Sequence, residues 1–303
     1  MANLQQADTL TATRSGFQDF TKRRSVRTAV WITFLTIVVT LGSIFLLFPV
    51  AFMISSSLKT QGQSFLLPIK WIPGVEFPPQ WVNYPTALNF MKWTVVYLNT
   101  IIVAVGTIVG TVISSTVVAY GFARFRAPGR SVLFGLMLST LMVPGATLLV
   151  PSYIGFSRLG FVNTFWPLIL PAWFGSAFNI FLLRQFFTTI PMAMDEAATI
   201  DGAGPLRTLL EILVPQIRPA VAVVAIGALT FSWNDFLVPL IYLNSTDRRT
   251  AAVALSGFQA VYGGTPLNLL MAASLVMMLP LVVLFFGLQR YFIQGIVITG
   301  VKG

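Results

Sequence analysis

The sequence predicts an all-α membrane protein with six transmembrane helices. Hydrophobic residues make up 56% of its 303 residues and charged residues only 9%, and the mean hydropathy is +0.82. A soluble domain carries about a quarter charged residues, so most of this surface must face lipid. A spanning helix needs about 20 mainly apolar residues, and six such stretches occur, at 30–54, 94–119, 132–150, 165–183, 220–241 and 267–288.

Composition also excludes several kinds of site. The chain has no Cys and no His, which excludes disulfide frameworks, Cys/His metal centres and Cys- or His-based catalysis. The net charge of +10 is the balance expected where basic residues flank membrane spans, and no basic groove-reading element is present. We therefore expect no metal, no catalytic residue and no nucleic-acid partner.

The basic residues predict the orientation. Of the 19 Lys and Arg residues, 13 fall in the two terminal tails and in the loops after the second and fourth spans. Because the cytoplasmic side carries the excess of Lys and Arg, both termini are expected inside. The chain then divides into a cytoplasmic tail at 1–28, a first span and extracytoplasmic loop at 29–94, five spans at 95–290 and a cytoplasmic tail at 291–303.

The loop after the first span and the second span itself carry only weak indications of function. The loop at 55–93 is rich in Pro and aromatic residues, which suits either the lipid headgroup level or a surface that docks an outside partner. In the second span, Gly106 and Gly110 are spaced for close helix packing. That spacing indicates ordinary bundle packing and no particular function.

The loop between the fourth and fifth spans, 191–215, carries the strongest signal. It holds four of the nine acidic residues and predicts two short helices. The first begins near Pro191, and Gly202 and Gly204 end it. Helices this short are marginal alone, so Ala197, Ala198 and Ile200 are expected to be buried. The burying surface is either the cleft of a partner or the chain's own bundle.

The second short helix is expected to begin at Pro205 and to end at Pro215. The leucines Leu206, Leu209, Leu210 and Leu213 fall at i, i+3, i+4 and i+7, which predicts one apolar face. Arg207 and Glu211 are spaced to pair at i, i+4.

The fifth span carries Asp235, the one acidic residue near a predicted span, beside Trp233 and Asn234. An ionisable group there is a functional hypothesis by default. A Trp ring stacks on a sugar face, and Asn and Asp bind hydroxyls, so the three residues are candidates for a substrate path. A structural hydrogen bond, or a position near the outer interface, is the alternative.

The spacing in the 191–215 loop resembles the EAA motif of ATP-binding cassette (ABC) importer permeases. The matching residues are Glu196, Ala197, Ala198, Asp201, Gly202, Ile212 and Pro215, with Val214 in place of the usual Leu. The runs 120–130, 231–240 and 289–303 are similar to binding-protein-dependent sugar permeases, and especially to the second six-span subunit of the maltose type. This resemblance implies a type I importer (MetI-like) fold whose loop helices couple to an ATPase.

The resemblance also implies the partners. They are a homologous second permease subunit, two copies of an ATP-binding subunit that holds ATP and Mg²⁺, an extracytoplasmic solute-binding protein and the bacterial inner membrane. The chain itself lacks a Gly-x-x-x-x-Gly-Lys-[Ser/Thr] loop and is not expected to bind ATP. The substrate class implied is carbohydrate, such as maltodextrin or trehalose, with glycerol 3-phosphate or another polyol as the alternative.

Two other classes of function are weighed against this one. A self-sufficient secondary transporter predicts paired charges within the spans, and an intramembrane enzyme without His or Cys needs a carboxylate dyad or a Ser–Lys pair. Only Asp235 lies near a predicted span, which disfavours both.

Overall fold

The computed structural model describes the backbone of residues 2–260 and 265–300 and the side chains of residues 28–258 and 265–287. Within these ranges the protein is almost entirely helical, as predicted, and its one extended pairing is an isolated bridge between Pro73 and Phe77. Among the described residues, four stretches are long and apolar enough to cross a bilayer, Thr28–Ser57, Trp93–Arg124, Trp166–Thr189 and Leu267–Gly287, and two bent helix pairs also pass that test.

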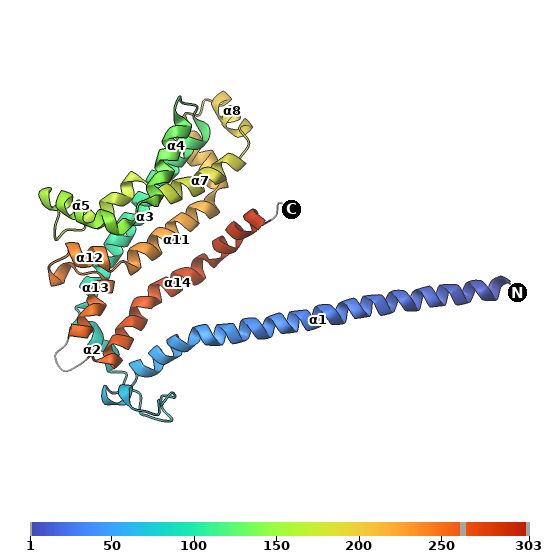
Figure 1. Cartoon of the computed structure of the whole chain (residues 1–303), viewed down its shortest axis with the longest axis horizontal. Coiled ribbons are helices and arrows are strands. Elements are labelled where there is room, and N and C mark those ends of the chain that lie inside the picture. The colour runs from blue at the N-terminus through green and yellow to red at the C-terminus, as the bar shows by residue number, and fades with distance from the viewer. Residues whose placement is uncertain (1, 261–264, 301–303) are drawn as a thin grey trace.

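The first and last spans belong to long helices, α1 (Ala2–Ser57) and α14 (Leu267–Gly300). The side chains of the expected tails, 1–28 and 291–303, lie almost wholly outside the described residues. Residues 28–49 of α1 are all exposed within the chain, whereas Ser55, Ser56 and Ser57 at the end of the helix are buried. Figure 1 shows α1 pointing away from the other helices over most of its length.

The third predicted span, 132–150, is bent rather than straight. Helix α4 (Arg130–Ser139) and the 3-10 turn η2 (Thr140–Met142) end before Pro144, and α5 (Gly145–Arg158) begins after it, at 98° to the first half. A proline disfavours helical geometry in the residue before it, and Val143 is extended, with ψ 117°. The prediction of one unbroken span was therefore wrong here.

The fourth predicted span, 165–183, is irregular in its middle and longer at its end. It consists of α6 (Trp166–Ile169), the 3-10 turn η3 (Leu170–Phe174) and α7 (Ala177–Thr189). The break falls at Gly175, whose φ of 91° is a backbone conformation that glycine adopts readily.

The fifth predicted span, 220–241, also breaks. Helix α11 (Arg218–Asn234) stops before Asp235, and a separate helix, α12 (Leu237–Tyr242), follows. The Asp235 carboxylate accepts a hydrogen bond from the Val238 N–H at 3.3 Å, which satisfies a free donor in the first turn of α12. The expected continuous helix through Asp235 was wrong because this side chain starts a new helix.

Helix α3 (Trp93–Arg124) is the centre of the bundle, because it packs against α7, α11 and η3. The small residues of α3 allow the close approach. A β-carbon added at Gly110 would lie 2.4 Å from the Trp173 side chain, and one at Gly106 would lie 2.9 Å from Ile169. The predicted packing role of Gly106 and Gly110 is confirmed, and the packing partner is η3 with the end of α6.

The two ends of the bundle differ (Figure 1). At one end lies α8 (Ala193–Ile200), between the fourth and fifth spans; at the other lie α2 (Asn83–Phe90) and α13 (Ala251–Ser256). We call these the α8 end and the α2 end. The remaining short turns, η1 (Gly62–Phe65), η5 (Thr246–Arg248) and η6 (Gly257–Ala260), belong to the α2 end.

Buried polar groups hold the α2 end together. The Asn83 amide donates to the carbonyls of Ser57 at 2.8 Å and Lys59 at 2.7 Å, and its oxygen accepts from Asn268 at 3.0 Å. These bonds join the loop after α1 to α2 and α14. Lys59 is only 2% exposed; burial lowers the pKa of its amine, and the field of Glu76 opposes that shift.

Replacing Asn83 with Ala is expected to lower the stability of the folded chain by about 3 kcal/mol, since each buried group left without a partner costs roughly 1–3 kcal/mol. The measurement is the thermal midpoint of the detergent-purified protein. Asn89→Ala, on the exposed face of the same helix, is the control. Equal midpoints for the two variants would contradict the structural role.

Candidate functional site

The first candidate site is the segment between α7 and α11, which begins with the short helix α8. Asp195 and Glu196 lie in its first turn, where the helix dipole favours negative charge. Ala198 is 3% exposed, whereas Glu196, Ala197 and Ile200 are exposed. Of the two surfaces considered for this helix, the chain's own bundle buries only Ala198, and burial of Ala197 and Ile200 in a partner's cleft stays a prediction.

A glycine turn ends α8, as predicted. The N–H of Gly202 donates to the Thr199 carbonyl at 3.1 Å, and the N–H of Ala203 donates to the Ala198 carbonyl at 2.8 Å. Gly202 has φ 76°, the left-handed geometry typical of a residue just past a helix end. Asp201 is the last residue before this turn and is exposed.

The second short helix begins at Pro205 as predicted, but its middle is a π-helix. It consists of α9 (Pro205–Arg207), the π-helical segment η4 (Thr208–Leu213) and α10 (Val214–Gln216). The helix runs one residue past Pro215, which lies half-buried beside its end. Pro205–Gln216 then meets α11 at 88°.

The π-helix changes which leucines face inward. Leu209 and Leu213 are buried in a cluster with residues of α3, α7 and α11, and Ile212 packs against that cluster. Leu206 and Leu210 instead face outward, at 64% and 57% exposed. The predicted four-leucine face was wrong, because the wider π-turn does not keep the α-helical period. The predicted Arg207–Glu211 pair is confirmed at 2.8 Å on the surface.

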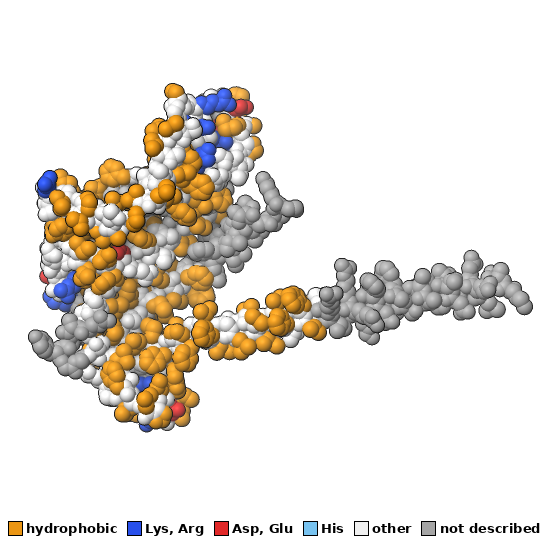
Figure 2. All heavy atoms as spheres, in the orientation of Figure 1, with side chains coloured by type: hydrophobic (Ala, Val, Ile, Leu, Met, Phe, Trp, Pro, Cys, Tyr) orange, Lys and Arg blue, Asp and Glu red, His pale blue; other side chains and the backbone are white. Residues whose placement is uncertain are grey.

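The α8 end therefore combines a fixed helix with a projecting one. The second short helix is anchored in the core, while α8 presents Ala197 and Ile200 outward, with Ile200 at 87% exposed. Figure 2 shows basic side chains gathered at this end of the molecule, beside an acidic one. Because the exposed face belongs to a short helix that projects from the anchored segment, α8 is the candidate docking element of this end.

The second candidate site is split by the structure. Trp233 is 4% exposed, donates its indole N–H to the Met277 carbonyl at 3.2 Å and packs edge-on against Tyr97. Its ring therefore belongs to the contact between α11, α3 and α14. Asn234 and Asp235 lie elsewhere, on an open groove of about 850 Å³ along α11 that Thr230 and Phe231 also line. The structure brings Asn234 and Asp235 together and separates Trp233 from them.

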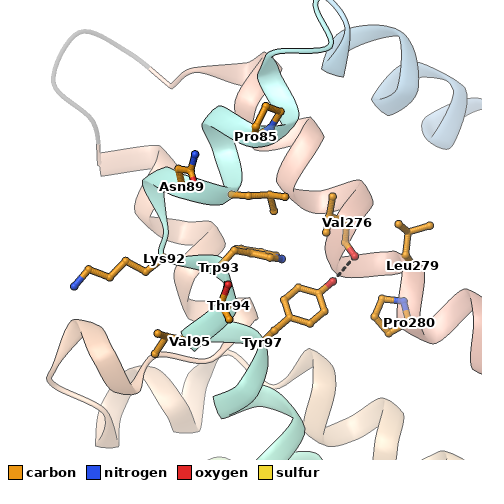
Figure 3. Close-up of a pocket in the computed structure, with 11 residues that line it drawn as sticks. Pro85, Asn89, Lys92, Trp93, Thr94, Val95, Tyr97, Val276, Leu279 and Pro280 are labelled. Carbon is orange, nitrogen blue, oxygen red and sulfur yellow. Dashed lines mark hydrogen bonds between the residues drawn. The ribbon is translucent and has the colours of Figure 1, made fainter.

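A third feature was missed by reasoning from the sequence. An open cavity of about 890 Å³ lies at the α2 end between α2, the start of α3 and α14. Figure 3 shows Trp93 and Tyr97 side by side in its wall, with the Tyr97 hydroxyl donating to the Val276 carbonyl, and Asn89 and Lys92 at its edge. The i, i+4 spacing of two aromatics at the start of a span was the signal that could have indicated it.

A match to a known protein family identifies what kind of protein the chain is. Residues 115–298 match the family described as "Binding-protein-dependent transport system inner membrane component". The chain belongs to this family. It is thus an inner-membrane permease of the ABC-importer type, and the predicted family and fold class are confirmed.

Individual relatives of the permease agree with this family assignment. It is 36% identical over 226 residues to the osmoprotective compounds uptake permease protein GgtD of Synechocystis sp., covering 73% of this chain and 74% of the relative. It is 31% identical over 262 residues to the sn-glycerol-3-phosphate permease protein UgpE of Salmonella typhi, covering 85% and 92%. It is 34% identical over 205 residues to the arabinooligosaccharides permease protein AraQ of Halalkalibacterium halodurans, covering 68% and 73%.

A solved structure shares the fold. The permease resembles a chain in the crystal structure of a bacterial ABC transporter involved in the import of the acidic polysaccharide alginate, with a TM-score of 0.76 over 87% of this chain and 96% of that chain. At 20% identity the likeness extends to the fold alone.

Proposed function

We propose that this permease takes its energy from ATP hydrolysed on partner subunits, through α8, and conducts a neutral carbohydrate or polyol across the inner membrane. The observation that carries the coupling role is the exposed face of α8. A helix of 8 residues is marginal by itself, and here only Ala198 is buried. The narrow side formed by Ala197 suits entry into a cleft of the ATP-binding subunit.

The residues of the motif divide into two roles in this proposal. Glu196, Ala197 and Ile200 form the docking face, and Gly202 sets the angle at which α8 leaves the second helix. Ile212 and Pro215 lie on the helix that is anchored to the core. The anchored helix then acts as a lever between the docking face and α11.

Four further components complete the proposed assembly: a homologous second permease, two ATP-binding subunits that hold ATP and Mg²⁺, and a solute-binding protein outside. The α8 end faces the cytoplasm with both termini, because the excess of Lys and Arg predicts that orientation. Residues 28–49 of α1 are mainly apolar and exposed within the chain, which leaves them for lipid and for the second permease.

The substrate class rests on the relatives and on the groove along α11. UgpE and AraQ are named for glycerol 3-phosphate and arabinooligosaccharides, so sugars and a phosphorylated polyol are the natural range. Asn234 and Asp235 offer hydroxyl-binding groups, and the described residues of the groove include no Lys or Arg. A carboxylate without a nearby cation disfavours a phosphate ester, which favours a neutral carbohydrate over the glycerol 3-phosphate alternative.

Purification of the native complex through a tag on this chain tests the proposal. The ATP-binding subunits, a second permease and a solute-binding protein are expected to co-purify, and vesicles holding the complex are expected to take up the protein-bound sugar only with internal ATP. Gradient-driven uptake by this chain alone would overturn the proposal and favour a secondary transporter.

Gly202→Arg is expected to uncouple uptake from ATP hydrolysis without preventing membrane insertion. A side chain at φ 76° is strained by about 1–2 kcal/mol, which redirects α8, while no atom lies within 4 Å of an added β-carbon. The measurement is uptake and ATPase activity in assembled complexes. Gly204→Ala, at ordinary φ of −73°, is the control, and normal uptake by Gly202→Arg would contradict the lever.

A further inference from the structure

A buried ion pair joins the end of α3 to α8. The Arg124 Nη2 atom lies 3.3 Å from the Asp195 Oδ2 atom, and the two side chains are only 6% and 16% exposed. The same guanidinium donates to the Ile190 carbonyl at 3.0 Å and contacts the Met192 sulfur at 2.9 Å. One arginine therefore hydrogen-bonds the chain that enters α8 and forms an ion pair with the first turn of the helix.

Two other arginines brace the same region without reaching α8. Arg184 donates to the Phe122 carbonyl at 3.3 Å and stacks over the Phe134 ring at 4.4 Å, and Arg130 donates to the Phe125 carbonyl at 2.8 Å. These contacts fix the end of α3 to α7 and α4. Arg124 extends from this fixed base to α8.

We propose that the Arg124–Asp195 pair is a positioning tie that transmits the movement of α8 directly to α3. This inference rests on the proposed coupling role of α8. The anchored second helix gives one route, from Gly202 through η4 to α11. The ion pair gives a second route, and it leads to α3, the helix that packs against α7, α11 and η3.

The low exposure of the Arg124–Asp195 pair suits it to transmit movement from α8 to α3. Separating two buried charges leaves each of them without compensation, whereas their net contribution to stability is small. The pair therefore resists separation more than it stabilises the fold. The surface pair Arg207–Glu211, at 66% and 62% exposed, is screened by water and salt and provides the matched comparison.

The test uses the whole complex, with its ATP-binding subunits and binding protein, in vesicles. Asp195→Asn is expected to raise the ATP hydrolysed per solute imported roughly 10-fold, within the 5–150-fold range typical of coupling between sites, in complexes that assemble and hydrolyse ATP. Glu211→Gln is expected to leave this ratio unchanged. An unchanged ratio in Asp195→Asn, or an equal fall in uptake and ATPase activity, would overturn the proposal.

A second variant keeps the test decisive if Asp195→Asn does not assemble. The doubly neutral Arg124→Gln/Asp195→Asn variant leaves no lone buried charge and is expected to show the same raised ratio.

Since the chain has no Cys, Arg124→Cys/Asp195→Cys can also be joined by a short bis-thiosulfonate linker, which is expected to restore coupling until it is reduced. No recovery on linking would overturn the proposal. Loss of ATP-driven uptake in the wild-type complex would instead overturn the proposed function.

Discussion

Ile200→Asp is expected to abolish ATP-driven uptake while the chain remains inserted in the membrane. Ile200 is 87% exposed in the chain alone, and docking of α8 into a partner cleft would bury it. Burying an isoleucine contributes about 1.5–3 kcal/mol, and an unpaired carboxylate in its place is costly to bury. The affinity for the ATP-binding subunit is expected to fall at least about 100-fold, since each 1.4 kcal/mol is tenfold.

The measurement is a titration of the membrane subunits in detergent with the ATP-binding subunit, followed by uptake in vesicles. Val75→Asp is the matched control, because Val75 is 80% exposed in the loop after α1, at the α2 end. It is expected to leave this affinity unchanged. Wild-type affinity in Ile200→Asp would mean that this face of α8 does not dock into the ATP-binding subunit and that the coupling proposal is wrong.

Gly110→Leu is expected to prevent folding of the bundle. An added β-carbon would lie 2.4 Å from the Trp173 side chain and a still larger residue would meet the whole indole. Overpacking typically costs about 1–3 kcal/mol and occasionally more, and here the bulky Trp173 indole lies directly in the way of the new side chain. Little monodisperse protein is expected in detergent.

Gly110→Ala and Gly121→Ala give a graded comparison on one helix. Nothing lies within 4 Å of a β-carbon at Gly121, so Gly121→Ala is expected to gain the helix propensity of alanine, about 1 kcal/mol. Gly110→Ala is expected to lower the thermal midpoint of the purified chain. A midpoint for Gly110→Ala at or above that of Gly121→Ala would show that the gap between α3 and η3 adapts.

The candidate site could be predicted in part from local signals. The prolines and glycines of the 191–215 segment predict where its two helices begin and end, because each acts on its own backbone. The Arg207–Glu211 pair follows from helical spacing alone. The inward side of the second helix could not be predicted, because a π-helix at Thr208–Leu213 replaces the expected α-helical period and only Leu209 and Leu213 of the four leucines enter the core. The sequence likewise grouped Trp233 with Asn234 and Asp235, although the Trp233 indole donates a hydrogen bond to the Met277 carbonyl of α14 and does not line their groove.

By itself the sequence determined the class of protein: lipid is the solvent, six apolar stretches supply the helices, and the spacing around Glu196 to Pro215 identifies the family. These properties depend on composition and on residues near one another in the chain. Only the tertiary structure decided where the spans bend, which face of α8 stays exposed, and that Arg124 meets Asp195 across 71 positions. Such contacts depend on how distant helices pack, because close packing fixes the partner of each side chain, and no local pattern encodes that partner.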